Sequence, residues 1–397
     1  MERSSLESLA RCHEDTEIWY DSSPLIYRAW REGFLARQAA GDGPDLSSAL
    51  QALYDPDHPA AGYLRGSTTN QPLALQALQE RWPEFEQWIA GATRSHPEWS
   101  PQQVAWETFK EVARRGAEML FPIFETSGKR YGYICAQVDP RLSRDTNAMV
   151  EQAVELNSIS PNIMVKMPGT DAGIKGVRQL AARGVPTNLT LAYTVSQLVA
   201  LAEAADAGKR EAEARGVDLS AWRSCATMML GRFEDHPAVK EQAAAAGVEL
   251  SETDLRWAGV AVFKKAYRLY RDRGYSTKML AASMRVGPKE GGKTRIWHLE
   301  KFAGGNVVLT IFPNIIEEFL LAYRGEEIAP HIDEPVPDEV IKKLRRVPYF
   351  RQAYDEDGQT PEEYDSYPPL VATADGFTKA MTDFEARVVA AVEKVRA

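Results

Sequence analysis

The octapeptide Pro161-Asn-Ile-Met-Val-Lys-Met-Pro168 joins a short apolar run to a single lysine. The run 163–165 predicts a buried strand, and Pro168 can end it because proline has no N–H to donate to a ladder. Lys166 then lies at the carboxyl end of the strand. Burial favours the neutral amine, which can attack a carbonyl to form a Schiff base. On these residues alone the simpler interpretation is a strand-end lysine whose ammonium reaches water.

Strand patterns recur along the chain, and nearly every one is followed by a helical pattern. Such alternation predicts parallel strands joined by right-handed crossovers, and eight units predict a closed α/β barrel of the (β/α)₈ or TIM type. The eight strand patterns fall at 18–21, 66–70, 131–138, 163–168, 185–191, 221–229, 277–283 and 306–312. Helical patterns fill most of the remainder, including a helix after an N-cap at Ser143 and a stretch between Arg285 and Asn306.

We expect a single barrel domain over residues 1–397, with extra helices at both ends. Its core spans about 17–323. Residues 40–63 are rich in Gly and Pro and predict an insertion, while 328–397 form a C-terminal extension that ends in an amphipathic helix.

Composition narrows the class of protein. The chain has 397 residues, 44% of them hydrophobic, and a net charge of −9, which argues against a general nucleic-acid surface. Three cysteines form no Cys-x-x-Cys pair, and the N-terminus lacks the apolar core of a signal peptide, so a cytoplasmic location is expected. No apolar run is long enough to span a membrane. The six histidines are scattered without metal-ligand spacing, so no metal and no cofactor are expected.

Polar side chains collect where the predicted strands end, the face on which such barrels carry their chemistry. Each has a simpler interpretation as a turn cap, a satisfied strand hydroxyl or a surface ion pair. Together they place an amine, a carboxylate, amides, hydroxyls and two arginines at one rim. The rim residues are Asp21, Asn70, Gln137, Lys166, Asn188, Thr190, Thr227, Arg232, Ser283 and Arg285.

This set suits Schiff-base chemistry on a phosphorylated sugar. Asp21 is the rim carboxylate that could move protons during carbon–carbon cleavage. Asn70 and Asn188 can hydrogen-bond sugar hydroxyls. Arg232 and Arg285 can hold a phosphate, because a guanidinium offers a bidentate fork.

The chain resembles the transaldolases, class I Schiff-base enzymes of the pentose phosphate pathway. No single motif is decisive, but the ordered set is specific. The matching segments are Trp19-Tyr-Asp21, Thr68-Thr-Asn-Gln-Pro72, Val138-Asp-Pro-Arg-Leu-Ser143, Val165-Lys-Met-Pro168, Thr187-Asn-Leu-Thr190, Thr227-Met-Met-Leu-Gly-Arg232 and Ala282-Ser-Met-Arg285.

The resemblance implies a role for each rim residue and a C-terminal helix near the mouth of the barrel. Lys166 corresponds to the Schiff-base lysine, Asp21 to the proton acceptor in cleavage, and Thr190 to the residue that holds the catalytic water. Contacts to the donor sugar are implied for Asn70, Asn188 and Thr227, and a phosphate site for Arg232, Ser283 and Arg285.

One residue departs from the family pattern. Transaldolases carry glutamate just before the Val-Asp-x-Arg-Leu-Ser segment, where this chain has Gln137. A glutamine amide can hold a catalytic water but exchanges no proton at neutral pH. Glutamine at this place resembles the fructose-6-phosphate aldolase branch, which releases free dihydroxyacetone.

Three functions therefore stay open. The first is transfer of a dihydroxyacetone unit from a ketose phosphate, such as sedoheptulose 7-phosphate or fructose 6-phosphate, to an aldose phosphate. The second is a simple or specialised sugar-building aldolase with the same intermediate. The third is a non-catalytic sugar-phosphate-binding protein. In each case phosphorylated sugars are the expected ligands, nucleic acid and membrane are not expected partners, and the protein is expected to be a monomer or homodimer.

Overall fold

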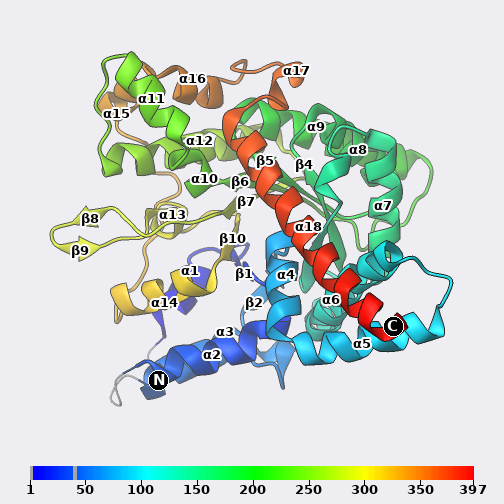
Figure 1. The fold of residues 1–397 in the computed structure, drawn as a ribbon. Coiled ribbons are helices and arrows are strands. Elements are labelled where there is room, and N and C mark those ends of the chain that lie inside the picture. The colour runs from blue at the N-terminus through cyan, green and yellow to red at the C-terminus, as the bar shows by residue number, and fades with distance from the viewer. Residues whose placement is uncertain (1–2, 39–42) are drawn as a thin grey trace.

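Eight parallel strands close into a barrel in the computed structural model, which describes residues 3–38 and 43–397 (Figure 1). Each strand pairs with its sequence neighbours, and β1 pairs with both β2 and β10 to close the ring. The predicted (β/α)₈ barrel is confirmed. Its strands are β1 (Glu17–Tyr20), β2 (Leu64–Ser67), β3 (Tyr133–Gln137), β4 (Ile163–Pro168), β5 (Thr187–Ala192), β6 (Ser224–Met229), β7 (Lys278–Ala282) and β10 (Val308–Ile311).

Apolar side chains fill the barrel below the rim. Trp19, Tyr133, Met164 and Leu280 belong to one buried cluster. Gly66 makes room for the indole, because a Cβ at that position would lie 2.5 Å from Cε2 of Trp19. This packed interior supports the polar residues above it and leaves the rim as the place for chemistry.

Helices surround the barrel. The principal ones are α2 (Tyr27–Ala36), α4 (Gln71–Glu80), α5 (Trp82–Ser95), α6 (Pro101–Thr126), α7 (Thr146–Ser158), α8 (Asp171–Ala181), α9 (Val195–Ala214), α12 (Glu252–Arg273) and α14 (Pro313–Ala322). Shorter elements are α1 (Ser5–Arg11), η1 (Pro24–Ile26), α3 (Gly43–Leu53), η2 (Pro59–Ala61), η3 (Pro140–Leu142), α10 (Leu230–Glu234), α11 (Pro237–Ala245) and α13 (Trp297–Glu300).

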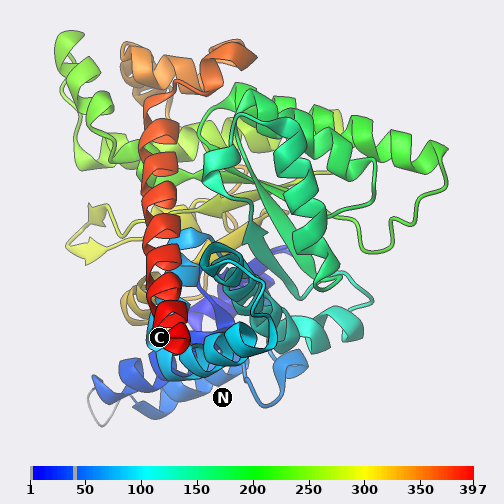
Figure 2. The same ribbon diagram turned by 45° about the vertical axis from the view of Figure 1, so that its right-hand side comes forward.

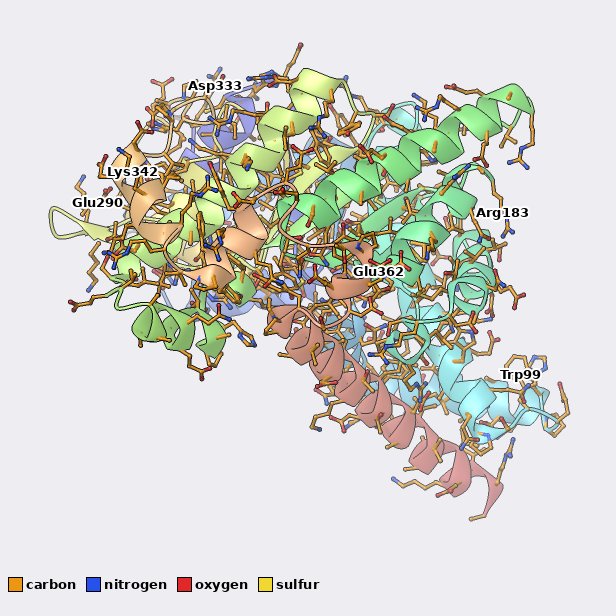
Figure 3. All side chains as sticks on the ribbon, turned by 90° about the horizontal axis from the view of Figure 1, so that it is seen from above. Trp99, Arg183, Glu290, Asp333, Lys342 and Glu362 are labelled. Atoms are coloured by element: carbon orange, nitrogen blue, oxygen red, sulfur yellow. The ribbon has the colours of Figure 1, made fainter. Side chains whose placement is uncertain are left out.

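Two local predictions were wrong. The N-cap of α7 is Asp145, whose carboxylate accepts from the N–H groups of Asn147 and Ala148, because the turn η3 delays the helix past Ser143. The stretch after Arg285 is a hairpin of β8 (Lys289–Glu290) and β9 (Lys293–Thr294), with only the four-residue α13 behind it. The hairpin projects from the barrel in Figure 1 and Figure 2, and Glu290 at its tip lies at the edge of the molecule in Figure 3.

The C-terminal segment crosses one side of the barrel. It runs through α15 (Asp338–Leu344), α16 (Pro348–Tyr354) and α17 (Pro361–Tyr364) to α18 (Pro368–Arg396), drawn red in Figure 1. α18 packs on α4, α5 and α6 and also contacts β5 and α10 at the rim. Of the predicted insertion 40–63, residues 40–42 lie outside the described residues, and the remainder contains α3 and η2. No helix in the described ranges is long and apolar enough to cross a membrane.

Candidate active site

Three polar side chains lie side by side in the barrel wall. Gln137 on β3 pairs in register with Lys166 on β4, which pairs with Asn188 on β5. In parallel strands, registered residues point to the same face, so an amine stands between two amides. All three are buried, with Lys166 only 3% exposed. The interpretation of Lys166 as a strand-end lysine reaching into water therefore does not hold.

Asp21 follows β1 at the same rim and is fixed by hydroxyl groups. Its Oδ1 accepts from the Thr68 hydroxyl at 2.7 Å, and Thr68 Oγ1 lies 2.6 Å from Thr310 Oγ1. Because Thr68 has one proton and gives it to Asp21, Thr310 donates to Thr68. Sequence reasoning assigned no role to either threonine, although inward hydroxyls at strand ends were the available signal.

The environment of Asp21 raises the pKa of its carboxyl above the ordinary value for aspartate. Burial raises the pKa of this carboxyl to about 6, although the positive charge of Lys166 and the Thr68 hydrogen bond both act to lower it. A carboxyl with such a pKa can accept a proton and return it near neutral pH, as a general acid–base group must.

Asn188 and Thr227 form a second fixed pair. The Thr227 hydroxyl donates to Asn188 Oδ1 at 2.7 Å, and Asn188 Nδ2 lies 3.3 Å from Cys135 Sγ. The amide of Asn188 is thereby oriented beside Lys166. Thr227 therefore also orients the side chain of Asn188.

The Thr190 hydroxyl lies 3.8 Å from Met229 Sδ. The same sulfur lies 3.6 Å from the Tyr193 hydroxyl, which also lies 2.8 Å from Thr373 Oγ1 on α18. The C-terminal helix is therefore linked through Tyr193 to the strand that carries Thr190. Sequence reasoning missed Tyr193, since only the fold brings Thr373 to it.

Gln137 retains an unused acceptor. Its Oε1 is buried and has no hydrogen-bond partner within the part of the chain that the structure describes. Since buried polar atoms are nearly always satisfied, this oxygen calls for a water or a ligand hydroxyl.

The two rim arginines are held differently. Arg285 Nε donates to Asp235 at 2.6 Å. The simpler interpretation of Arg285 as a member of an ion pair is thus confirmed. Arg232 is exposed, and its guanidinium lies 5.6 Å from the ring centre of Phe377 on α18. Ser283 adopts a left-handed backbone conformation with φ 58°, and its carbonyl accepts from the N–H of Gly231 at 2.8 Å.

Asn70 lies at the start of α4, and its Oδ1 accepts from the Leu73 N–H at 3.1 Å. The alternative of a capping role for Asn70 is thus confirmed. The described residues contain no group of three His, Cys, Asp or Glu side chains that could hold a metal ion.

A barrel with a buried lysine among amides, and a carboxylate and arginines at the same rim, agrees with the comparison to known proteins. The profile of the transaldolase/fructose-6-phosphate aldolase family matches residues 52–356. The chain belongs to this family. It is therefore a member of a family of Schiff-base enzymes that act on sugar phosphates.

Individual relatives agree. A transaldolase of Thiobacillus denitrificans is 34% identical over 269 residues, which are 67% of each chain. Transaldolase 1 of Streptomyces avermitilis is 30% identical over 161 residues, or 40% of this chain and 42% of the relative. Transaldolase 1 of Streptomyces coelicolor is 33% identical over 172 residues, covering 43% and 44%. The matches to the two Streptomyces proteins thus span less than half of those relatives. The family description names both transaldolase and aldolase, so membership leaves the reaction itself to be argued from the site.

Proposed function

We propose that the protein transfers a three-carbon dihydroxyacetone unit from a ketose phosphate to an aldose phosphate through a Schiff base on Lys166. The observation that carries this proposal is the buried amine of Lys166, in register between Gln137 and Asn188 at the rim that also holds Asp21. An amine beside oriented amides suits attack on a ketone whose neighbouring carbons bear hydroxyls.

The proposed reaction assigns a task to each group. Lys166 Nζ adds to the C2 carbonyl of the ketose, and loss of water gives the imine. Asp21 then takes the proton of the C4 hydroxyl as the C3–C4 bond breaks; the C4 aldehyde leaves and an enamine remains. The enamine adds to the aldehyde of an acceptor, Asp21 returns the proton to the new hydroxyl, and water releases the product from Lys166.

The remaining residues bind and orient. Asn188, held by Thr227, and Asn70 are assigned to hydroxyls of the donor, and Thr190 to the water that enters and leaves with the imine. Arg232, Arg285 and Ser283 are assigned to the phosphate.

Product analysis tests transfer against simple cleavage. Fructose 6-phosphate is incubated with the protein, with and without erythrose 4-phosphate. Transfer predicts sedoheptulose 7-phosphate only when the acceptor is present, and no free dihydroxyacetone. Free dihydroxyacetone without an acceptor would instead establish the aldolase, which the amide at Gln137 favours. Binding of the sugar phosphate with no product in either incubation would establish a binding protein.

Gln137→Glu is expected to speed turnover. Imine formation and hydrolysis move protons through a bound water, and a glutamine neither accepts nor releases one. The added carboxyl has almost the same shape and must be ionised to act as a base, so a new acidic limb should enter the pH–rate profile. Rapid-quench trapping with borohydride measures the rate of imine formation. A slower or unchanged rate would mean that the pocket is built around the amide, and the aldolase or binding protein would gain support.

Arg232→Ala and Arg285→Ala are each expected to weaken binding of phosphorylated sugars by about 1.5–3 kcal/mol, the range for a charge-assisted hydrogen bond. Fructose should be affected much less than fructose 6-phosphate, because it lacks the phosphate. Comparison of the two KM values checks this. Arg178→Ala is a matched control, since Arg178 pairs with Glu211 on the outer helices α8 and α9. Equal losses for both sugars would mean that the rim arginines serve the fold.

A further inference from the structure

Arg285 belongs to a closed ring of polar contacts whose other members have no part in the proposed reaction. The backbone N–H of Arg285 donates to His298 Nδ1 at 3.0 Å. The proton of His298 is therefore on Nε2, which donates to Glu234 Oε1 at 2.8 Å. Glu234 also accepts from Arg256. Arg256 Nη2 donates to Asp235 Oδ1 at 3.2 Å, and the other oxygen of Asp235 accepts from Arg285 Nε at 2.6 Å.

Most of this ring is inside the protein. Glu234 and His298 are 0% exposed and Arg256 is 6% exposed. Gly259 leaves room for the Glu234 carboxylate, because a Cβ at position 259 would lie 2.0 Å from Glu234 Oε1. Burying an ion pair is costly in desolvation and contributes little net stability compared with apolar packing. The ring is thus better explained by the orientation it imposes than by stability.

The ring fixes the orientation of one guanidinium, that of Arg285. Arg285 Nε is engaged by Asp235, and Nη1 donates to the carbonyls of Ser283 and Met284 at 3.1 and 3.0 Å. Nη2 has no hydrogen-bond partner among residues 3–38 and 43–397, so one edge of the fork is left for a ligand. Close approach of Arg285 also requires Gly231, where a Cβ would lie 2.6 Å from its Cζ.

We propose that Asp235, held by the buried chain of Arg256, Glu234 and His298, is a positioning residue that presets Arg285 for the phosphate end of the ligand. This inference rests on the proposed function for the assignment of Arg285 to phosphate. Asp235 could also have the opposite effect. If its carboxylate only competed with the phosphate for the Arg285 guanidinium, it would weaken phosphate binding. Positioning and competition therefore predict effects of opposite sign.

The test is a calorimetric titration of the full-length protein with inorganic phosphate and with fructose 6-phosphate. Asp235→Ala is expected to weaken binding of both about tenfold, equivalent to roughly 1.4 kcal/mol. Asp57→Ala is the matched control, since Asp57 forms an exposed ion pair with Arg28 on α2, outside the ring, and its loss should leave both affinities unchanged. Unchanged or tighter binding in Asp235→Ala would overturn the inference, as would absence of phosphate binding in the parent protein.

Two variants of His298 each retain one of its two contacts and remove the other. Glutamine can reproduce the Nε2 donor to Glu234, whereas asparagine can reproduce the Nδ1 acceptor for the Arg285 N–H. Positioning predicts that each folded variant binds phosphate more weakly than the parent, with the KM for fructose 6-phosphate raised and that for fructose unchanged. A parallel change in both KM values would overturn it. Borohydride trapping of dihydroxyacetone on the parent protein tests the proposed function separately, because this ketone carries no phosphate.

Discussion

Lys166→Ala is expected to abolish turnover and the covalent adduct together. Incubation of the parent protein with fructose 6-phosphate and borohydride should add a dihydroxyacetone-derived mass to Lys166, because reduction converts the imine into a stable secondary amine. The variant has no amine at this place, so neither adduct nor product should form. Intact-mass spectrometry followed by peptide mapping makes the measurement.

Two controls make the result specific. Lys166→Met retains an apolar stem in the barrel wall and separates loss of the amine from loss of packing, which thermal unfolding monitors. Lys175→Ala removes an exposed lysine that pairs with Asp171 on α8, and should retain the adduct. An adduct that persists in Lys166→Ala, on Lys264 or Lys278 for example, would overturn the assignment. Both of these lysines are engaged elsewhere: Lys264 by backbone carbonyls of His331 and Glu334, and Lys278 by Glu17.

The barrel could be predicted because its signals are local. Apolar runs bounded by Pro, Gly and Asp recur in step with helical patterns, and closure follows once eight units are counted. The rim residues could be predicted from the same pattern, because the end of a strand is recognised from the local sequence without knowing its distant contacts. Lys166, Asn188 and Gln137 thus appear in adjacent strands as expected.

The contacts between rim residues could not be predicted in this way. The hydroxyl partner of Thr68 comes from Thr310, and the acceptor for the Arg285 N–H comes from His298. These pairs form only when the barrel closes and the chain returns to the rim. The hairpin at 289–294, in contrast, had a local signal in the sequence that was missed. Gly291 and Gly292 both have positive φ, at 57° and 81°, which suits a two-residue hairpin turn.

Asp21→Ala is expected to slow carbon–carbon cleavage by roughly 10²–10⁴-fold, the usual contribution of a positioned acid–base group. Imine formation should survive, because the amine of Lys166 is untouched. The covalent intermediate should then accumulate, and borohydride should trap more of it in the steady state than in the parent. Asp21→Asn is the companion variant, since an amide oxygen can still accept from Thr68. Turnover within a few-fold of the parent in both variants would reduce Asp21 to a turn residue.

The pH profile gives an independent measure of the same carboxyl. Because burial raises the pKa of Asp21 to about 6, its basic form is lost as the pH falls through that value, and kcat/KM should fall with it. The phosphate of the substrate titrates near pH 6 as well. Fructose has no phosphate, so an acidic limb that remains with fructose belongs to the protein. That limb should disappear in the residual activity of Asp21→Asn. If it persists there, another group carries the proton and Asp21 acts only through its charge beside Lys166.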